Sequence, residues 1–157
     1  MNYGFDDYEA AILQALASLN TGTGGYLKTL KGYAGELDED AALDNFIRGF
    51  PGVLVEVSEA TYDAATMPFY LEEATVNLLV GSRSYRSEKA ARGGSTGAYT
   101  ILKDLRRLLL GKTLGLEIRP LQLVRQVKMT GLSPRAAKTA IYLAEYRLKN
   151  DYIAEEV

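Results

Sequence analysis

The sequence predicts an α+β fold, with a mixed, mostly antiparallel sheet and helices packed on one side. Segments with apolar residues at helical spacing alternate along the chain with segments rich in β-branched and aromatic residues. The connections in the later half are short enough for hairpins, which pair neighbouring strands antiparallel. The chain has 157 residues, 47% of them apolar, and this composition suits a single domain.

The first half of the chain predicts two helices and two strands. They are a helix over 6–19, a strand over 26–33, a helix over 38–49 and a strand over 53–59. In the first helix, Ile12 and Leu16 belong to one apolar stripe. The second helix begins at Asp38, a good N-cap, and ends at Gly49, after which Pro51 prevents its resumption.

The second half predicts one strong helix among strands. In order we expect an exposed connection at 60–68, a strand over 69–85, a polar glycine-rich segment at 86–97, a helix over 98–111, a strand over 116–129, a turn at 130–135 and a strand over 136–150. Glu72 shares the apolar face of its strand, so that end of the strand is expected to leave the core. The order is α-β-α-β-β-α-β-β, in one domain over 1–157 with residues 150–157 frayed.

The residue types limit the chemistry. The chain has no cysteine and no histidine, which excludes thiolate nucleophiles, zinc–thiolate sites and any Ser-His-Asp arrangement. An enzyme would have to rely on carboxylates, lysine or tyrosine. No run of about 18 apolar residues occurs, so no membrane span is expected. The acidic N-terminus has no basic-then-apolar signal segment, and this predicts that the chain stays in the cytoplasm where it is made.

Charge is divided unevenly along the chain. Residues 1–80 carry 13 acidic and 3 basic side chains, a balance of −10, whereas residues 81–149 carry 4 acidic and 15 basic ones, a balance of +11. If the fold interleaves the two halves, the surface is mixed. If it separates them, one acidic and one basic face can steer head-to-tail association of subunits or rings, and the basic face could tolerate DNA.

The stretch RGGSTGAY at 92–99 has the composition of a phosphate-binding loop but not its pattern. Gly93, Gly94 and Gly97 precede a predicted helix, yet no lysine follows Gly97 as a P-loop requires. The spacing G-G-x-x-G also differs from the dinucleotide fingerprint, and a polar stretch separates it from the preceding strand. Nucleotide binding is therefore only an alternative to a structural role.

The same segment predicts a mobile basic loop that becomes ordered on contact with a partner. Four cations accompany a single acid, Glu88, and two glycines supply the hinge. The bland alternative is an ordinary solvated surface. The candidate interface residues are Arg83, Arg86, Lys89, Arg92, Gly93 and Gly94.

Two stretches, LKTLKGYAGELDEDAALDNFIRGFPGVLVEV and GGSTGAYTILKDLRRLLLGKTLGLEIRPLQL, resemble a family of tail proteins of Mu-like phages and prophages. The shared pattern is a strand ending in GYAGEL, an acidic helix closed by FPGVLV, a glycine-rich loop before GAYTIL-DLR-LL-G, and then LGLEIRPL. The resemblance extends from Asp7 to Lys149, and nothing in it matches the TGLSPR turn or the extreme C-terminus.

The resemblance implies a tail terminator: a structural protein, neither enzymatic nor cofactor-dependent, that forms a homo-hexameric ring on the finished tube and sheath. Such a ring stops polymerisation and presents the docking surface for the head. The implied partners are copies of itself, tube and sheath proteins and head-completion proteins, with DNA contact only in the lumen. The implied location is a virion or a headless tail-like particle, assembled in the bacterial cytoplasm.

Two other functions stay open. One is a head–tail connector or neck protein that contacts DNA through the basic half of the chain. The other is an anion- or nucleotide-binding enzyme that uses the glycine-rich loop.

Overall fold

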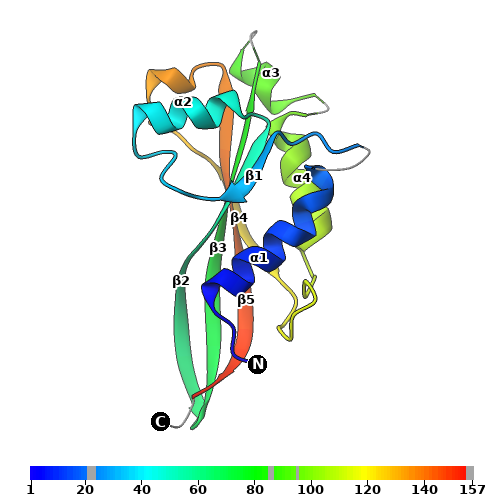
Figure 1. Cartoon of the computed structure of the whole chain (residues 1–157), viewed down its shortest axis with the longest axis vertical. Helices are drawn as coiled ribbons and strands as arrows, with labels where there is room; N and C mark the ends of the chain where they lie inside the picture. Colours follow the sequence, from blue (N-terminus) through cyan, green and yellow to red (C-terminus); the bar gives the residue numbers. More distant parts are fainter. Residues whose placement is uncertain (21–23, 85–86, 95, 155–157) are drawn as a thin grey trace.

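The chain is built on one five-stranded sheet with helices beside it (Figure 1). A computed structural model describes residues 1–20, 24–84, 87–94 and 96–154. The helices are α1 (Phe5–Leu16), α2 (Asp40–Arg48), α3 (Glu88–Arg92) and α4 (Ala98–Leu109), with 3₁₀ turns η1 (Ala17–Leu19) and η2 (Pro134–Ala136). The strands are β1 (Thr29–Gly32), β2 (Gly52–Thr66), β3 (Phe69–Arg83), β4 (Gln122–Lys128) and β5 (Thr139–Ile153). The predicted order is confirmed, except that α3 lies in the segment expected to be a loop.

The sheet is mixed and mostly antiparallel, as predicted. Its strand order is β1-β2-β3-β5-β4. Only β1 and β2 pair in parallel, and α2 lies in the connection between them, because parallel neighbours need a long crossover. The pairs β2–β3, β3–β5 and β4–β5 are antiparallel. The predicted α+β class is confirmed.

The helices cover both faces of the sheet, which corrects the prediction that they pack on one side. The larger core joins α1 and α4 to one face, whereas α2 packs its own apolar residues on the opposite face. The reason is visible in β2, where the consecutive residues Val53, Leu54 and Val55 are all fully buried. A strand that is buried on both sides needs cover on both sides.

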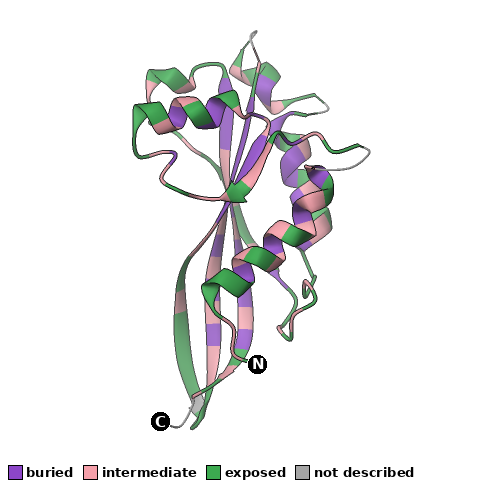
Figure 2. Ribbon diagram, viewed as in Figure 1, coloured by how far each residue is buried: buried purple, intermediate pink, exposed green. Residues whose placement is uncertain are grey.

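Strands β2, β3 and β5 continue beyond β1 and the helices α2–α4 as a three-stranded arm (Figure 1). The expected connection at 60–68 is therefore mostly strand, because β2 runs to Thr66 and the turn contains only Met67 and Pro68. Figure 2 shows that this part of β2 is largely exposed. This portion of β2 is polar because it is an exposed strand, and not because it is a loop.

The ends of the last strands also differ from the prediction. β5 continues to Ile153 and Asn150 is completely buried, so 150–153 are not frayed. β4 begins at Gln122 rather than at 116. The preceding residues form a loop, in which the Leu116 amide donates to the Thr113 carbonyl at 2.9 Å and Pro120 has no amide hydrogen to give to a neighbouring strand.

Glu72 lies inside the core, which corrects the expectation that β3 leaves the core there. It is 1% exposed and accepts hydrogen bonds from the hydroxyls of Tyr8 and Tyr62, the second at 2.6 Å. Asn150 donates to the Tyr8 oxygen at 3.1 Å and to the carbonyl of Met1 at 2.9 Å. The two tyrosines, from α1 and β2, satisfy the buried carboxyl group, and Asn150 of β5 holds Tyr8 in place.

Burial and the hydrogen bond to Glu72 raise the pKa of Tyr8 above its ordinary value. The same hydrogen bond, with burial second, raises the pKa of Tyr62 to about 12. None of the helices in the described ranges is long and apolar enough to cross a membrane.

Candidate assembly surfaces

The predicted basic loop contains a short helix, which corrects the expectation that 86–97 has no regular structure. The side chain of Ser87 caps α3 by accepting a hydrogen bond from the Ala90 amide at 3.1 Å. Ala91 is 1% exposed and belongs to the larger core. One face of this segment is thus fixed against the sheet, and only the other face is available to a partner.

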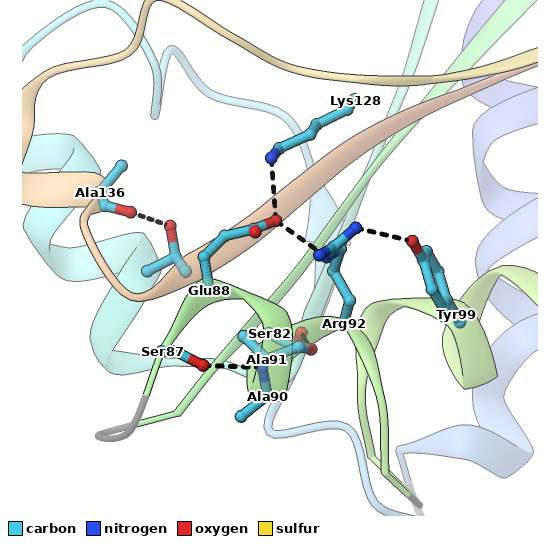
Figure 3. A network of polar contacts seen from close by, with 10 residues as sticks. Ser82, Ser87, Glu88, Ala90, Ala91, Arg92, Tyr99, Lys128 and Ala136 are labelled. Atoms are coloured by element: carbon cyan, nitrogen blue, oxygen red, sulfur yellow. Dashed lines mark hydrogen bonds and ion pairs between the residues drawn. The ribbon is translucent and has the colours of Figure 1, made fainter.

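Glu88 holds two of the nearby cations. Its carboxylate lies 2.9 Å from Lys128 Nζ of β4 and 3.2 Å from Arg92 Nε one helical turn along α3 (Figure 3). Arg92 extends the chain of contacts by donating to the Tyr99 hydroxyl at 3.1 Å. Arg92 therefore ties α3 to α4, and the segment is less positive at its surface than the sequence suggests.

The Arg92 network continues into a tyrosine pair between α4 and β5. The rings of Tyr99 and Tyr142 are 5.9 Å apart in an edge-on arrangement. Hydrogen bonding with Tyr142 and with Arg92 lowers the pKa of Tyr99, whereas burial raises that of Tyr142. Together with Leu102, Arg106 and Gln126, the two rings line a groove between α4 and β4.

The glycines close a tight turn before α4. Gly94 has a φ of +85°, and its carbonyl accepts hydrogen bonds from the Thr100 hydroxyl at 2.8 Å and from the Gly97 amide at 3.3 Å. A Cβ on Gly97 would lie 2.0 Å from the Gly93 carbonyl oxygen. The turn therefore has no room for a side chain at Gly97, which gives this glycine a structural role.

The five candidate interface residues that the structure describes lie in two places. Lys89, Gly93 and Gly94 are exposed around the end of α3, and Arg92 is turned toward Tyr99. Arg83 ends β3 and lines a different, small groove beside α2 together with Arg135 and Lys138. Arg86 lies outside the described residues. The ranges that the structure describes contain no group of three or more acidic side chains placed to hold a metal ion.

The tip of the arm is a surface that the sequence did not single out. Four large apolar side chains are exposed there, at 49%, 66%, 51% and 43% respectively: Tyr62, Met67, Phe69 and Ile153. The signal was the apolar run MPFY at 67–70. The prediction divided this run between an exposed connection that ended at Pro68 and a strand that began at Phe69, because the second half of β2 was not recognised as strand. Apolar groups gathered at a protruding tip are typical of a contact with another protein.

The fold defines an α+β protein whose mixed, mostly antiparallel sheet carries helices on both faces. The chain is similar to a solved chain described as "Virion of native gene transfer agent (GTA) particle", with a TM-score of 0.59 and 14% identity over 96% of this chain and 100% of the other. At this identity the likeness concerns the fold alone. No curated protein matches the sequence.

The chain belongs to the family described as Bacteriophage Mu, Gp37, whose sequence pattern matches residues 7–150. The resemblance to Mu-like phage proteins is therefore confirmed, over nearly the range in which it was recognised.

Proposed function

We propose that this protein is the tail terminator of a Mu-like contractile tail. The family match over residues 7–150 carries the proposal. The fold shared with a chain of a gene transfer agent virion, over 96% of this chain, supports it independently. The protein acts as a structural part without catalysis or cofactor, a role that needs none of the histidine or cysteine chemistry that the sequence lacks.

Termination works by surface complementarity. Subunits made in the bacterial cytoplasm close into a homo-hexameric ring on the finished tube and sheath, in a virion or a headless tail-like particle. One side of the ring binds the end of the polymer as a further subunit layer would. The other side has no surface that binds another layer, and it binds head-completion proteins instead. A ring built from one repeated contact needs two complementary patches on each subunit.

Electron microscopy of tails made without this protein tests the proposal. Overlong tubes with ragged ends are the expected result, because nothing stops polymerisation. Tails of normal length that join heads normally would overturn it.

We propose that the exposed side of α3 takes part in the contacts of the ring with its neighbours, together with Arg83 and Arg86. Lys89→Glu reverses an exposed charge and leaves the packing of α3 intact, so assembly should weaken while the melting temperature stays unchanged. Arg92→Glu is the matched comparison, since it removes the contacts to Glu88 and Tyr99 and should lower the melting temperature. Normal tails from a variant with Arg83, Arg86 and Lys89 all reversed would contradict this assignment.

A second candidate function is a neck protein that contacts DNA. It is favoured by Lys103, Arg106 and Arg107, which are all exposed on α4. Binding of the purified protein to duplex DNA that weakens steeply with added salt would support it. The deletion separates the two functions, because loss of a connector leaves tails of normal length that fail to join heads.

A further inference from the structure

The sheet has two open edges that differ in charge, and we propose that they pair between neighbouring copies of this chain. The outer edge of β2 in one subunit joins β4 of the next, so that the sheet continues around the ring. This inference rests on the proposed ring and names the contact that builds it.

The first open edge is the arm portion of β2. β1 ends at Gly32, opposite Val55, and among the described residues no strand pairs with the edge of β2 that faces away from β3 between Glu56 and Thr66. Register shifts interrupt the pairing of β2 with β3 near both ends of this portion, and 59–64 between them are regular. A long unpaired edge is a template for a strand from another chain.

The second open edge is β4, the last strand on the other side of the sheet. It has seven residues, Gln122–Lys128, and two of its valines are unusually exposed, Val124 at 42% and Val127 at 38%. Such exposure of β-branched side chains on an outer strand fits a surface that another chain covers.

The direction of the strands suits a ring. Because β2, β3, β5 and β4 are successively antiparallel, β4 runs opposite to β2 within one subunit. Rotation of a copy about a ring axis that runs along the strands leaves the direction of its β2 unchanged. The β2 edge of the next subunit therefore meets β4 antiparallel, which is the stronger way to pair two edges.

The charges of the two edges are complementary. Three carboxylates follow β2, and no cation in the described part of the chain lies within ion-pair distance of them: Glu56, Glu59 and Asp63. On β4, the side chain of Arg125 is 58% exposed although it pairs with Glu145. Opposite charges on the two edges favour this contact over pairing of like edges.

The side chains that would meet also lie on the same face. Thr61 pairs with Glu73 of β3, while Val127 pairs with Leu143, which in turn pairs with Leu79. Positions 73 and 79 of one strand share a face, so Thr61 and Val127 do too. Gln126, one residue earlier, points to the other face.

Cysteine trapping tests the pairing, and the natural chain contributes no cysteine of its own. Thr61→Cys is combined with Val127→Cys or with Arg125→Cys. These two positions of β4 lie on the same face as Thr61 and test two strand registers that differ by two residues. The variants are made in cells producing complete tails, and the isolated tails are oxidised in air. We expect one of these pairs to give a ladder of covalently linked subunits up to the whole ring on a non-reducing gel. Thr61→Cys with Gln126→Cys is the matched control and should stay monomeric.

The outcomes separate this contact from the function. The edge pairing is wrong if tails of normal length contain the same-face cysteine pairs but give no ladder. It is also wrong if the Gln126→Cys control gives an equal ladder. Neither result contradicts the terminator function. Normal tail length after complete deletion of the protein overturns the terminator itself. Melting curves of each purified variant show whether it is folded.

Discussion

Glu72 is a buried carboxyl group that connects elements far apart in the chain. It receives hydrogen bonds from Tyr8 of α1 and Tyr62 of β2, and Asn150 of β5 bonds to Tyr8. The arm and the first helix therefore share one polar centre. Because a buried polar group is costly when it loses a partner, this centre should matter more for stability than its few contacts suggest.

Tyr8→Phe should destabilise the protein by about 1–3 kcal/mol, because it leaves both Glu72 and Asn150 short of a partner in the core. Tyr62→Phe is the matched change at the other oxygen of Glu72, on a side chain that is 49% exposed. Water can replace that hydroxyl, so the expected loss is about 0.5 kcal/mol or less. Urea unfolding measures both, and equal losses would contradict the difference in burial.

Alkaline pH should weaken the fold through Tyr62. Its pKa rises from 10.0 to about 12 in the folded protein. Between these values the unfolded chain loses the tyrosine proton while the folded chain keeps it, so the stabilisation is complete below pH 10 and is lost as the pH rises toward 12. The midpoint of urea unfolding should fall across this window, and less steeply in Tyr62→Phe. A midpoint independent of pH there, or the same slope in the variant, would count against it.

The Glu72 centre could not be predicted from the sequence. Its partners lie 64 and 10 residues away, and Asn150 lies 142 residues from Tyr8. Strand periodicity placed Glu72 on the apolar face correctly, but the usual behaviour of a lone acid argued that the strand had left the core. Only the tertiary contacts decide between those two outcomes.

The element α3, its glycine turn and α4 form one rigid corner. Gly97→Ala places a Cβ 2.0 Å from the Gly93 carbonyl oxygen, so the turn must shift and the start of α4 with it. We expect a loss of about 1–3 kcal/mol. Gly93→Ala is the control, since its nearest neighbour would be 4.0 Å away and its φ of −89° suits alanine. Thermal melting compares them; a Gly97→Ala variant as stable as Gly93→Ala would show that the turn adapts.

Sequence patterns predicted the long elements and missed those that depend on their surroundings. The apolar stripe of α4 is complete within twelve residues, so periodicity found it. α3 has five residues and is held by its Ser87 cap and by the burial of Ala91, and the second of these is tertiary. The exposed half of β2 reads as polar because only one of its faces touches the core. The candidate site was divided for the same reason: Arg83 lines the small groove beside α2, whereas Arg92 is turned toward Tyr99 of α4.

Across the whole molecule, the acidic and basic halves of the chain are mixed over most of the surface and separate in one region. Acidic and basic halves are interleaved where Lys149 meets Glu73 at 3.7 Å across the sheet, and where Arg135 pairs with Asp40 at 3.5 Å beside α2. The charges remain separate along the β2 edge of the arm. Most of the surface therefore carries both signs of charge, and only the β2 edge of the arm is acidic. An electrostatic contact with a partner is thus restricted to that edge.

The arm tip should serve assembly rather than folding. Replacing Met67 and Phe69 together by serine removes exposed apolar surface only, so the melting temperature should stay within about 2 °C while tail assembly fails. Leu110→Ser is the control, at a side chain 43% exposed on the far end of α4. Electron microscopy of tails distinguishes them. Normal tails from the tip variant would show that the tip makes no contact that tail assembly requires.

The strand order of the sheet also affects how the protein reaches its native state. β3 is the central strand, yet one of its two neighbours, β5, is the last element of the described chain. Residues 84–138 must be synthesised before that edge of β3 can be covered, and pairings of such long range form slowly. While the ribosome makes these residues, the backbone amide and carbonyl groups on that edge of β3 have no strand to pair with. Nascent chains stalled before residue 139 should therefore depend on chaperones, whereas released chains should not.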